Sequence, residues 1–297
     1  MGDLLEGRRT SGPARLRELL LRPEPVIAPG AYDALSARLI EQAGFDVVYM
    51  TGFGTTASLI GRPDVGLLTG AEMVDNARRI VSAVGVPVVA DADTGYGNAL
   101  NVLRTVQLYE QAGVAGVQLE DQVTPKKCGH MSGKALIGAD EMVGKIRAAV
   151  EARRDPDLVV IARTDAVAVS GVEDAVARGR AYADAGADLL FIEAPTSEDD
   201  VARIAGELAG VAPLVFNWAE GGRTPPLSLD RIAELGFAMV IYPIGTLLAA
   251  TAGIRALLGT LKADGVPSLT GLPTFGEFTD LIGLPEVQQL EQRFAGE

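Results

Sequence analysis

Short apolar segments alternate with longer amphipathic segments along almost the whole chain. The short segments are rich in β-branched residues and have the length of buried strands, whereas the longer ones repeat apolar positions with the period of a helix. The expected strands are Pro25–Ala28, Asp46–Met50, Pro87–Ala90, Gly116–Leu119, Leu158–Ala162, Asp188–Ile192, Pro213–Phe216 and Ala238–Tyr242. The expected helices between them are Ala31–Ala43, Ala71–Val84, Ala99–Ala112, Ala139–Arg153, Val172–Ala185, Glu198–Ala209 and Ser228–Leu235.

Local signals at the segment ends support this division. Ala43-Gly44 and Ala112-Gly113 each close a helix pattern, because a glycine just past the last turn readily adopts the left-handed cap conformation. The alternating units match the length and order of a closed parallel (β/α)8 TIM barrel. A doubly wound open sheet is the structural alternative, but no Gly-x-Gly-x-x-Gly motif follows the first strand, so a dinucleotide-binding fold is poorly supported.

The chain of 297 residues is expected to form a single domain, 1–297, because no low-complexity linker interrupts the pattern. Residues 1–22 predict an N-terminal amphipathic helix that packs on this domain. A further helix, Gly245–Asp264, follows the last strand. Residues 265–297 are more than a barrel requires, so we interpret them as a C-terminal oligomerisation arm or cap.

Charge and composition exclude several classes of partner. The chain has 26 basic and 39 acidic residues, a net charge of −13, which argues against nucleic acid and anionic membrane surfaces. No apolar run is long enough to span a membrane, and the first residues lack the apolar segment of a secretory signal. The single cysteine excludes an internal disulfide and suits a reducing compartment. We expect a cytoplasmic protein that acts on a small molecule.

Two expected strands stop at carboxylates, although aspartate is disfavoured within strands. Asp91 and Asp93 follow the third strand, and Glu120 ends the fourth. Residues two apart in an extended segment face the same side, so we expect the Asp91 and Asp93 side chains to share one face. Barrel enzymes place their chemistry at the carboxyl ends of the strands, and carboxylates there are typical ligands of a hard cation, so we expect a Mg²⁺ site that Mn²⁺ would also fit. Asp64 and Glu120 are candidate outer partners through water. The alternative is a solvated turn in which an aspartate caps the helix that begins near Asn98.

The segment Lys126-Lys127-Cys128-Gly129-His130 contains the only cysteine and the only histidine of the chain. Cationic surroundings lower the pKa of a thiol and make it usable for proton transfer, whereas a lone cysteine is otherwise often a small buried apolar residue. One cysteine and one histidine are too few for a tetrahedral zinc site. Because Pro125–Lys134 has few apolar residues, we expect a mobile loop that closes over a bound substrate.

Other polar residues fall at the same expected edge of the sheet. Arg163 follows the fifth strand, Glu193 the sixth and Asn217 the seventh. Arg163 suits a bidentate clamp for a substrate carboxylate, and the alternative is an ion pair with Asp165 at the barrel rim. The glycine-rich turn around Gly52 is expected to present backbone N–H groups to an anion.

The motifs together resemble those of the isocitrate lyase/phosphoenolpyruvate mutase superfamily. The resemblance is carried by Asp91–Asn98, Leu119–Gln122, Lys126–His130 and Ile161–Asp165, and it extends from Gly30 to Val287. It implies a (β/α)8 barrel, a Mg²⁺ site, a mobile loop that carries the cysteine, and a homotetramer in which a C-terminal helix is exchanged between subunits.

The resemblance also implies roles for individual residues. The expected metal group is Asp91 and Asp93, with Asp64 and Glu120 behind bound water. The expected substrate-binding group is Thr51, Gly52, Phe53, Gly129, Arg163, Glu193 and Asn217. The expected catalytic group is the Cys128 thiol, its loop partner His130, and Tyr49 as acceptor of a substrate hydroxyl proton.

The activity implied is that of a Mg²⁺-dependent carbon–carbon lyase of carboxylic acid metabolism. It would cleave a substituted 2-hydroxy di- or tricarboxylate, such as 2,3-dimethylmalate or 2-methylisocitrate, to an α-keto acid such as pyruvate and a second carboxylate. The alternatives are a carboxyvinyl-carboxyphosphonate phosphorylmutase, which forms a carbon–phosphorus bond, and an oxaloacetate hydrolase or decarboxylase. A barrel that serves only as a binding scaffold is the non-enzymatic alternative.

Two positions depart from the superfamily pattern. Thr51 stands where the family usually has serine, and the hydroxyl group is kept. Leu248 aligns with an arginine that in methylisocitrate lyases binds the carboxylates of the second product, which weakens the case for a tricarboxylate. Glu220–Pro225 resembles the dimethylmalate lyase and carboxyphosphonate mutase subgroups.

Overall fold

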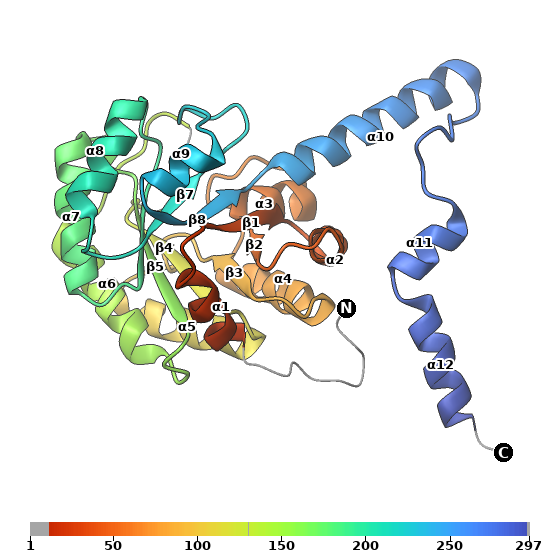
Figure 1. Ribbon diagram of the computed structural model, residues 1–297, viewed down its shortest axis with the longest axis horizontal. Coiled ribbons are helices and arrows are strands. Elements are labelled where there is room, and N and C mark those ends of the chain that lie inside the picture. The colour runs from red at the N-terminus through yellow and green to blue at the C-terminus, as the bar shows by residue number, and fades with distance from the viewer. Residues whose placement is uncertain (1–11, 130, 296–297) are drawn as a thin grey trace.

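The chain forms a closed barrel of parallel strands, taken in chain order and surrounded by helices (Figure 1). The structure is a computed structural model that describes residues 12–129 and 131–295. Its strands are β1 (Val26–Ala31), β2 (Val48–Met50), β3 (Val88–Asp91), β4 (Gly116–Glu120), β5 (Val159–Thr164), β6 (Leu189–Ile192), β7 (Leu214–Asn217) and β8 (Phe237–Tyr242). The (β/α)8 prediction is confirmed. Residues 1–11 and His130 lie outside the described residues, so what was expected of them stays a prediction.

Most of the helices occupy the intervals that the sequence pattern predicts. They are α1 (Gly12–Leu20), α2 (Ala34–Gln42), α3 (Gly52–Ile60), α4 (Gly70–Ala83), α5 (Ala99–Ala112), α6 (Ala139–Ala152), α7 (Val172–Asp184), α8 (Glu198–Leu208), α9 (Leu229–Glu234), α10 (Gly245–Asp264), α11 (Phe275–Leu281) and α12 (Leu284–Phe294). A 3-10 turn, Ala166–Ala168, follows β5. The bounds of α5 and α10 coincide with those expected.

Helix α3 is the element that the sequence pattern does not predict, because Gly52 and Gly54 lower helix propensity and resemble a turn. In the structure Thr51 caps this helix, and its Oγ accepts a hydrogen bond from the Gly54 N–H at 3.3 Å. A Cβ atom at Gly52 would lie 2.5 Å from Asp91 Oδ2, so a larger residue has no space there. Packing against the end of β3 therefore overrides local propensity and sets the N-terminus of α3 at the end of β2.

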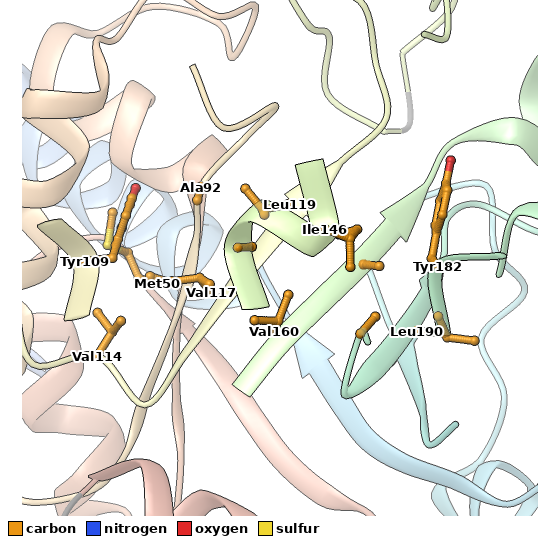
Figure 2. Packing of buried hydrophobic residues seen from close by; sticks show 14 of the residues in the cluster. Met50, Ala92, Tyr109, Val114, Val117, Leu119, Ile146, Val160, Tyr182 and Leu190 are labelled. Atoms are coloured by element: carbon orange, nitrogen blue, oxygen red, sulfur yellow. The ribbon is translucent and has the colours of Figure 1, made fainter. Parts of the chain in front are cut away.

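Side chains of the strands alternate between two apolar layers, because successive residues of a strand face opposite sides. Val159 and Ile161 of β5 belong to the cluster inside the barrel, together with Met239 of β8. Val160 belongs to the cluster between the strands and the outer helices, where it packs near Ile146 of α6 (Figure 2). The inner layer fills the barrel below its functional end, so the polar strand ends stand on a dry, rigid base.

Helix α1 closes the end of the barrel opposite the carboxyl ends of the strands. Leu16 and Leu19 are fully buried and join the cluster inside the barrel. Arg17 of α1 donates to the Asp157 carbonyl oxygen at 2.9 Å and pairs with the Asp188 carboxylate at 2.9 Å, just before β5 and β6 begin. The N-terminal helix thus packs as the floor of the barrel.

Helices α10, α11 and α12 extend away from the barrel (Figure 1), and none of them has a buried residue. Gln42 of α2 donates to the Leu281 carbonyl oxygen at 3.2 Å, which is a contact back to the barrel wall. Exposed apolar side chains on these helices are Leu248, Ile254, Leu258, Leu261, Phe275, Phe278, Ile282, Leu284, Val287 and Phe294. None of the described helices is both long and apolar enough to cross a membrane.

Replacing Leu16 by alanine should destabilise the barrel, because it leaves a cavity in the floor that α1 provides. We expect a loss of about 2–5 kcal/mol in unfolding free energy. The matched control is Leu21→Ala, since Leu21 is 85 % exposed just after α1 and its loss should cost less than about 0.5 kcal/mol. Urea unfolding followed by circular dichroism measures both, and equal midpoints for the two variants would contradict the assigned role of α1.

Candidate active site

A cavity of about 220 Å³ opens at the carboxyl ends of the strands. The predicted site residues that line it are Tyr49, Thr51, Phe53, Asp64, Asp91, Cys128, Gly129, Arg163, Glu193 and Asn217. Gly52 and Asp93 lie next to this lining, since a Cβ at Gly52 would lie 2.5 Å from Asp91 Oδ2 and 3.4 Å from Asp93 Oδ1. Segments that are far apart in the sequence therefore meet in one pocket.

Asp91 and Asp93 are brought together by a turn and not by an extended strand. Strand β3 ends at Asp91, whereas Asp93 has φ +47, in the left-handed region. The expectation that both side chains share one face of an extended segment is therefore wrong. The Asp93 N–H donates to Asp91 Oδ1 at 3.1 Å, and both side chains are buried. The tight turn keeps two carboxylates adjacent at the mouth of the barrel.

Lys126 lies among these acids. Its ammonium is 2.6 Å from Asp64 Oδ2 and 2.8 Å from Asp93 Oδ1, and its side chain is buried. Burial opposes the charge of Lys126, but the surrounding acids outweigh it and hold its pKa well above the ordinary value. The positive charge of Lys126 therefore lies between these carboxylates. The sequence alone does not show which acid each lysine pairs with.

The acids have the character of a site for a hydrated hard cation. Among the described residues, no group makes a hydrogen bond to either oxygen of the buried Glu120 carboxylate, although Arg163 Nε lies 3.3 Å from Oε2. Buried carboxylate oxygens without such partners are costly, and metal-bound waters would satisfy them. Within residues 12–129 and 131–295, no three Asp, Glu, His or Cys side chains converge closely enough to bind a metal directly. A hydrated hard cation keeps several waters and uses one or two carboxylates directly, so Asp91 and Asp93 are the candidate direct ligands.

Burial also shifts the titration of these acids. Desolvation, with the neighbouring Asp93 charge, raises the pKa of Asp91 to about 6. Desolvation likewise raises the pKa of Glu120 well above its usual range, against the opposing effects of Arg163 and Lys126. A divalent cation would lower both pKa values, because it favours the charged carboxylates.

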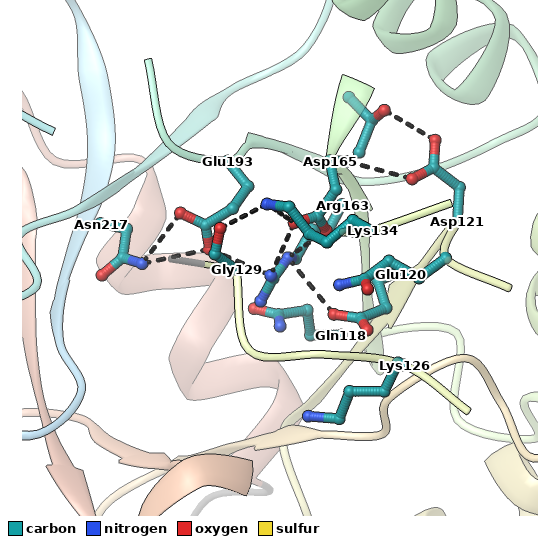
Figure 3. Close-up of polar contacts among 12 residues, drawn as sticks. Gln118, Glu120, Asp121, Lys126, Gly129, Lys134, Arg163, Asp165, Glu193 and Asn217 are labelled. Carbon is teal, nitrogen blue, oxygen red and sulfur yellow. Dashed lines mark hydrogen bonds and ion pairs between the residues drawn. The ribbon is translucent and has the colours of Figure 1, made fainter. Parts of the chain in front are cut away.

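Arg163 is held by acids on several sides (Figure 3). Its Nε and Nη2 donate to the two oxygens of Asp165 at 3.0 and 3.1 Å, and Nη2 lies 3.2 Å from Glu193 Oε2. Asn217 Nδ2 donates to both Glu193 oxygens at 3.3 and 3.2 Å. The ion pair with Asp165 is therefore present. Arg163 also lines the cavity, and its role as a clamp for a substrate carboxylate stays a prediction.

Tyr49 is placed as a hydrogen-bond donor. Its hydroxyl donates to Gln118 Oε1 at 3.2 Å, and Gln118 Nε2 lies 3.4 Å from Asp91 Oδ1. Burial and then the Asp91 charge raise the pKa of Tyr49 well above its ordinary value. A neutral phenol is therefore favoured, which works against proton acceptance by Tyr49. Gln118 was missed by sequence reasoning, although an amide within the apolar strand β4 was an available signal.

The loop that carries Cys128 folds over the cavity. The Cys128 N–H donates to the Asp64 carbonyl oxygen at 3.1 Å, and its half-buried side chain lines the pocket. A Cβ at Gly129 would lie 2.4 Å from Arg163 Nη2 and 2.6 Å from Glu193 Oε2, so only glycine allows this approach. The expectation that Pro125–Lys134 buries little is only partly correct, because two of its lysines are drawn inward by buried acids.

Apolar side chains also line the cavity. They include Phe53, Met131, Phe191, Ile241 and Ile244. Glu220 adds a carboxylate there, whereas the basic side chains in the described lining, Lys126 and Arg163, are both paired with acids. Leu248 is 46 % exposed and does not line the cavity.

Comparison with known proteins agrees with this geometry. Residues 16–262 match the family described as phosphoenolpyruvate phosphomutase. The 2,3-dimethylmalate lyase of Eubacterium barkeri is 50% identical over 284 residues, 95% of this chain and 98% of that protein. The chloroplastic carboxyvinyl-carboxyphosphonate phosphorylmutase of Arabidopsis thaliana is 44% identical over 287 residues, 95% of this chain and 84% of that protein.

The fold has a close counterpart among solved structures. A crystal structure of 2,3-dimethylmalate lyase, described as a member of the PEP mutase/isocitrate lyase superfamily, superposes with a TM-score of 0.91 at 43% identity and covers 97% of this chain and 96% of that chain. The resemblance expected from the motifs is thereby confirmed. The chain belongs to the phosphoenolpyruvate mutase/isocitrate lyase superfamily and is an enzyme of its lyase type.

Proposed function

We propose that the chain is a Mg²⁺-dependent carbon–carbon lyase that cleaves a 2-hydroxy dicarboxylate of the 2,3-dimethylmalate type to pyruvate and a monocarboxylate. One observation carries the proposal: a single cavity is lined by buried carboxylates, by Cys128 and by several apolar side chains. The 50% identical relative is a 2,3-dimethylmalate lyase, which supports the same substrate class.

The acid cluster is the proposed metal site. Asp91 and Asp93 would hold the ion, and Asp64 and Glu120 would face its waters, because the orphaned Glu120 oxygens need donors. When bound, Mg²⁺ supplies electrostatic stabilisation of negative charge on substrate oxygens. A structure of phosphonopyruvate hydrolase with oxalate and Mg²⁺, 34% identical with a TM-score of 0.88, supports this choice of ion and suggests oxalate as a ligand for experiments.

Residues of the strand ends would bind the α-keto acid half of the substrate. Arg163 supplies a buried guanidinium that suits a carboxylate. The N-terminus of α3 at Gly52 adds backbone N–H groups and the positive end of a helix dipole. Thr51 Oγ already accepts from Gly54, which leaves its own proton for the substrate. The Tyr49 hydroxyl, which now donates to Gln118, would donate to a substrate oxygen instead.

Cys128 would act on the departing fragment. As the carbon–carbon bond breaks, a carboxylate of the acid cluster would accept the substrate hydroxyl proton, and the electron pair of that bond would stay on the carbon next to the second carboxylate. The Cys128 thiol would protonate this carbon. After the products leave, the carboxylate would lose its proton and the thiolate would regain one, so protons balance over the turnover. The closed loop keeps bulk water away from the carbanion, which would otherwise be protonated without control.

The apolar lining and Glu220 favour a small leaving fragment with one carboxylate. A tricarboxylate would place a further negative charge near Glu220 and among apolar side chains, where the described lining supplies no unpaired cation. The methyl groups of a dimethylmalate-type substrate suit this apolar lining. Phosphorus–carbon bond formation on carboxyphosphonoenolpyruvate and oxaloacetate hydrolysis are the rival activities of the same site.

We also propose that α10–α12 pack against other copies of the chain, in the homotetramer with exchanged C-terminal helices that the sequence resemblance implies. The support is the row of apolar side chains that these helices leave exposed in one chain. A cytoplasmic location fits the acidic chain with its single cysteine.

Removing a metal carboxylate should weaken Mg²⁺ binding and lyase activity together. We expect Asp93→Asn to lower Mg²⁺ affinity by at least about tenfold in isothermal titration, because one direct ligand is lost. The control is Asp75→Asn, a half-exposed acid of α4 that pairs with Arg79 outside the cavity. Chelation should abolish pyruvate release in the wild type, with Mg²⁺ or Mn²⁺ restoring it. Equal affinity in Asp93→Asn and wild type would exclude Asp93 as a ligand.

Cys128→Ala should lower kcat by about 10²–10⁴-fold, the usual contribution of a positioned proton donor. Oxalate should still bind, because the thiol is not among the groups that hold the keto-acid half. Pyruvate release, coupled to lactate dehydrogenase, measures the rate, and calorimetry measures oxalate affinity. Full activity in this variant would remove Cys128 from the mechanism.

The chain should prefer 2,3-dimethylmalate over 2-methylisocitrate by about 10²-fold in kcat/KM, because the extra carboxylate would stay buried without a partner. Glu220→Gln should narrow this preference, since it removes a like charge. A substrate panel read by pyruvate release, with ³¹P NMR for carboxyphosphonoenolpyruvate, separates the lyase from its rivals. Equal kcat/KM for 2,3-dimethylmalate and 2-methylisocitrate would contradict the proposed substrate class. A new phosphinate signal without carbon–carbon cleavage would contradict the proposed lyase activity.

A further inference from the structure

The two ends of the cysteine loop are joined to each other. Gln122 and Leu136 form an isolated antiparallel bridge. The Val123 N–H donates to the Ala135 carbonyl oxygen at 2.8 Å just inside this bridge. The root of the loop is therefore fixed next to the end of β4, and we call the segment between these residues the flap.

Residues 124–129 form the first arm of the flap, which ends at its tip, and residues 131–134 form the second arm. Lys134 lies in the second arm and points inward (Figure 3). Its side chain is only 1 % exposed, its Nζ is 2.7 Å from Asp165 Oδ1, and it also donates to the Gly129 carbonyl oxygen. A buried ammonium is costly unless it is paired and hydrogen-bonded, so this position requires both partners. The same group thus contacts the loop tip next to Cys128 and the barrel.

Asp165 is a fixed anchor for this contact. Both of its oxygens accept from Arg163, and its backbone N–H donates to Asp121 Oδ1 at 3.0 Å. Asp121 is itself fully buried and accepts from the Tyr182 hydroxyl at 2.7 Å and from Arg178 at 3.1 Å. The carboxylate that receives Lys134 is therefore held by β5 and by α7 behind it.

The other lysines of the loop have different positions. Lys127 Nζ donates to the Gly133 carbonyl oxygen at 2.7 Å, which is a contact inside the loop. Lys126 ties the first arm to Asp64 and Asp93. Lys134 ties the second arm and the tip, because it bridges the Gly129 carbonyl to a carboxylate of the barrel.

We propose that Lys134 is a positioning residue that fastens the loop over the cavity and sets Cys128 and Gly129 against the substrate. Its ion pair with Asp165 forms when the loop closes and is lost to water when the loop opens. Because Asp165 Oδ1 receives both Lys134 and Arg163, loop closure and the orientation of the substrate-binding guanidinium are coupled. This inference rests on the proposed function for its catalytic consequence, whereas its structural part does not depend on turnover.

The test compares wild type with Lys134→Met, Lys134→Gln and Lys134→Arg as full-length, Mg²⁺-loaded enzymes. Cys128 is the only cysteine of the chain, so its alkylation by iodoacetamide can be followed by intact mass without ambiguity. Rates are measured with and without oxalate, and kcat and KM are measured on 2,3-dimethylmalate. Ser132→Ala is the matched control, because Ser132 is an exposed residue of the same loop.

In oxalate, we expect Cys128 to be alkylated about tenfold faster in Lys134→Met and Lys134→Gln than in wild type, because closure loses a charged contact. We also expect kcat to fall more than KM rises, and Lys134→Arg to recover most of both effects. Ser132→Ala should behave as wild type. Thermal unfolding verifies that each variant is folded.

Alkylation of both neutral variants at the wild-type rate in oxalate would overturn the inference. The inference would also be overturned if Lys134→Arg did not recover the protection of Cys128 from alkylation and Ser132→Ala lost it. That result would mean that any substitution in the loop exposes Cys128. Absence of any lyase turnover in wild type, with the expected alkylation pattern intact, would sink the proposed function and leave the Lys134 contact supported.

Discussion

The site depends on the ion pairs that surround the buried guanidinium of Arg163. Strand register places Arg163 of β5 directly opposite Glu120 of β4. A charge removed from water is tolerated only with close counter-charges and hydrogen bonds, and Asp165 and Glu193 complete that requirement. Burial opposes the charge of Arg163, but these three acids outweigh it and hold its pKa well above the ordinary value. The register of a closed barrel thus fixes where the acids must stand.

The acids around Arg163 create a need for more positive charge, and the cysteine loop supplies it. Lys126 pairs with Asp64 and Asp93 on one side, and Lys134 pairs with Asp165 on the other. Folding the loop onto the barrel is therefore favourable because it compensates buried carboxylates. This contact also delivers the thiol to the cavity, so electrostatic compensation and the assembly of the site are one event.

Much of the fold followed from local patterns. Strands and most helices were predictable because a buried strand and an amphipathic helix each leave a periodic trace in the sequence. Helix α3 was not, because Gly52 and Gly54 are selected by contact with Asp91 and Tyr32 and not by helix propensity. The site residues were identified largely from strand ends and motifs. Gln118 and the anchoring role of Asp165 escaped, because their partners are distant in the chain.

The sequence by itself determined the strand–helix order, the barrel and which residue types gather at its carboxyl end, because these depend on periodicity and on the parallel direction of the strands. Only the tertiary structure decided which charges pair. Lys126, Lys127 and Lys134 are chemically alike and belong to one loop, yet two are buried against acids and one contacts a loop carbonyl. Electrostatic energy depends on distance and burial. The distances between these charges and the burial of each charge are set only when the barrel has closed and the loop has folded over it.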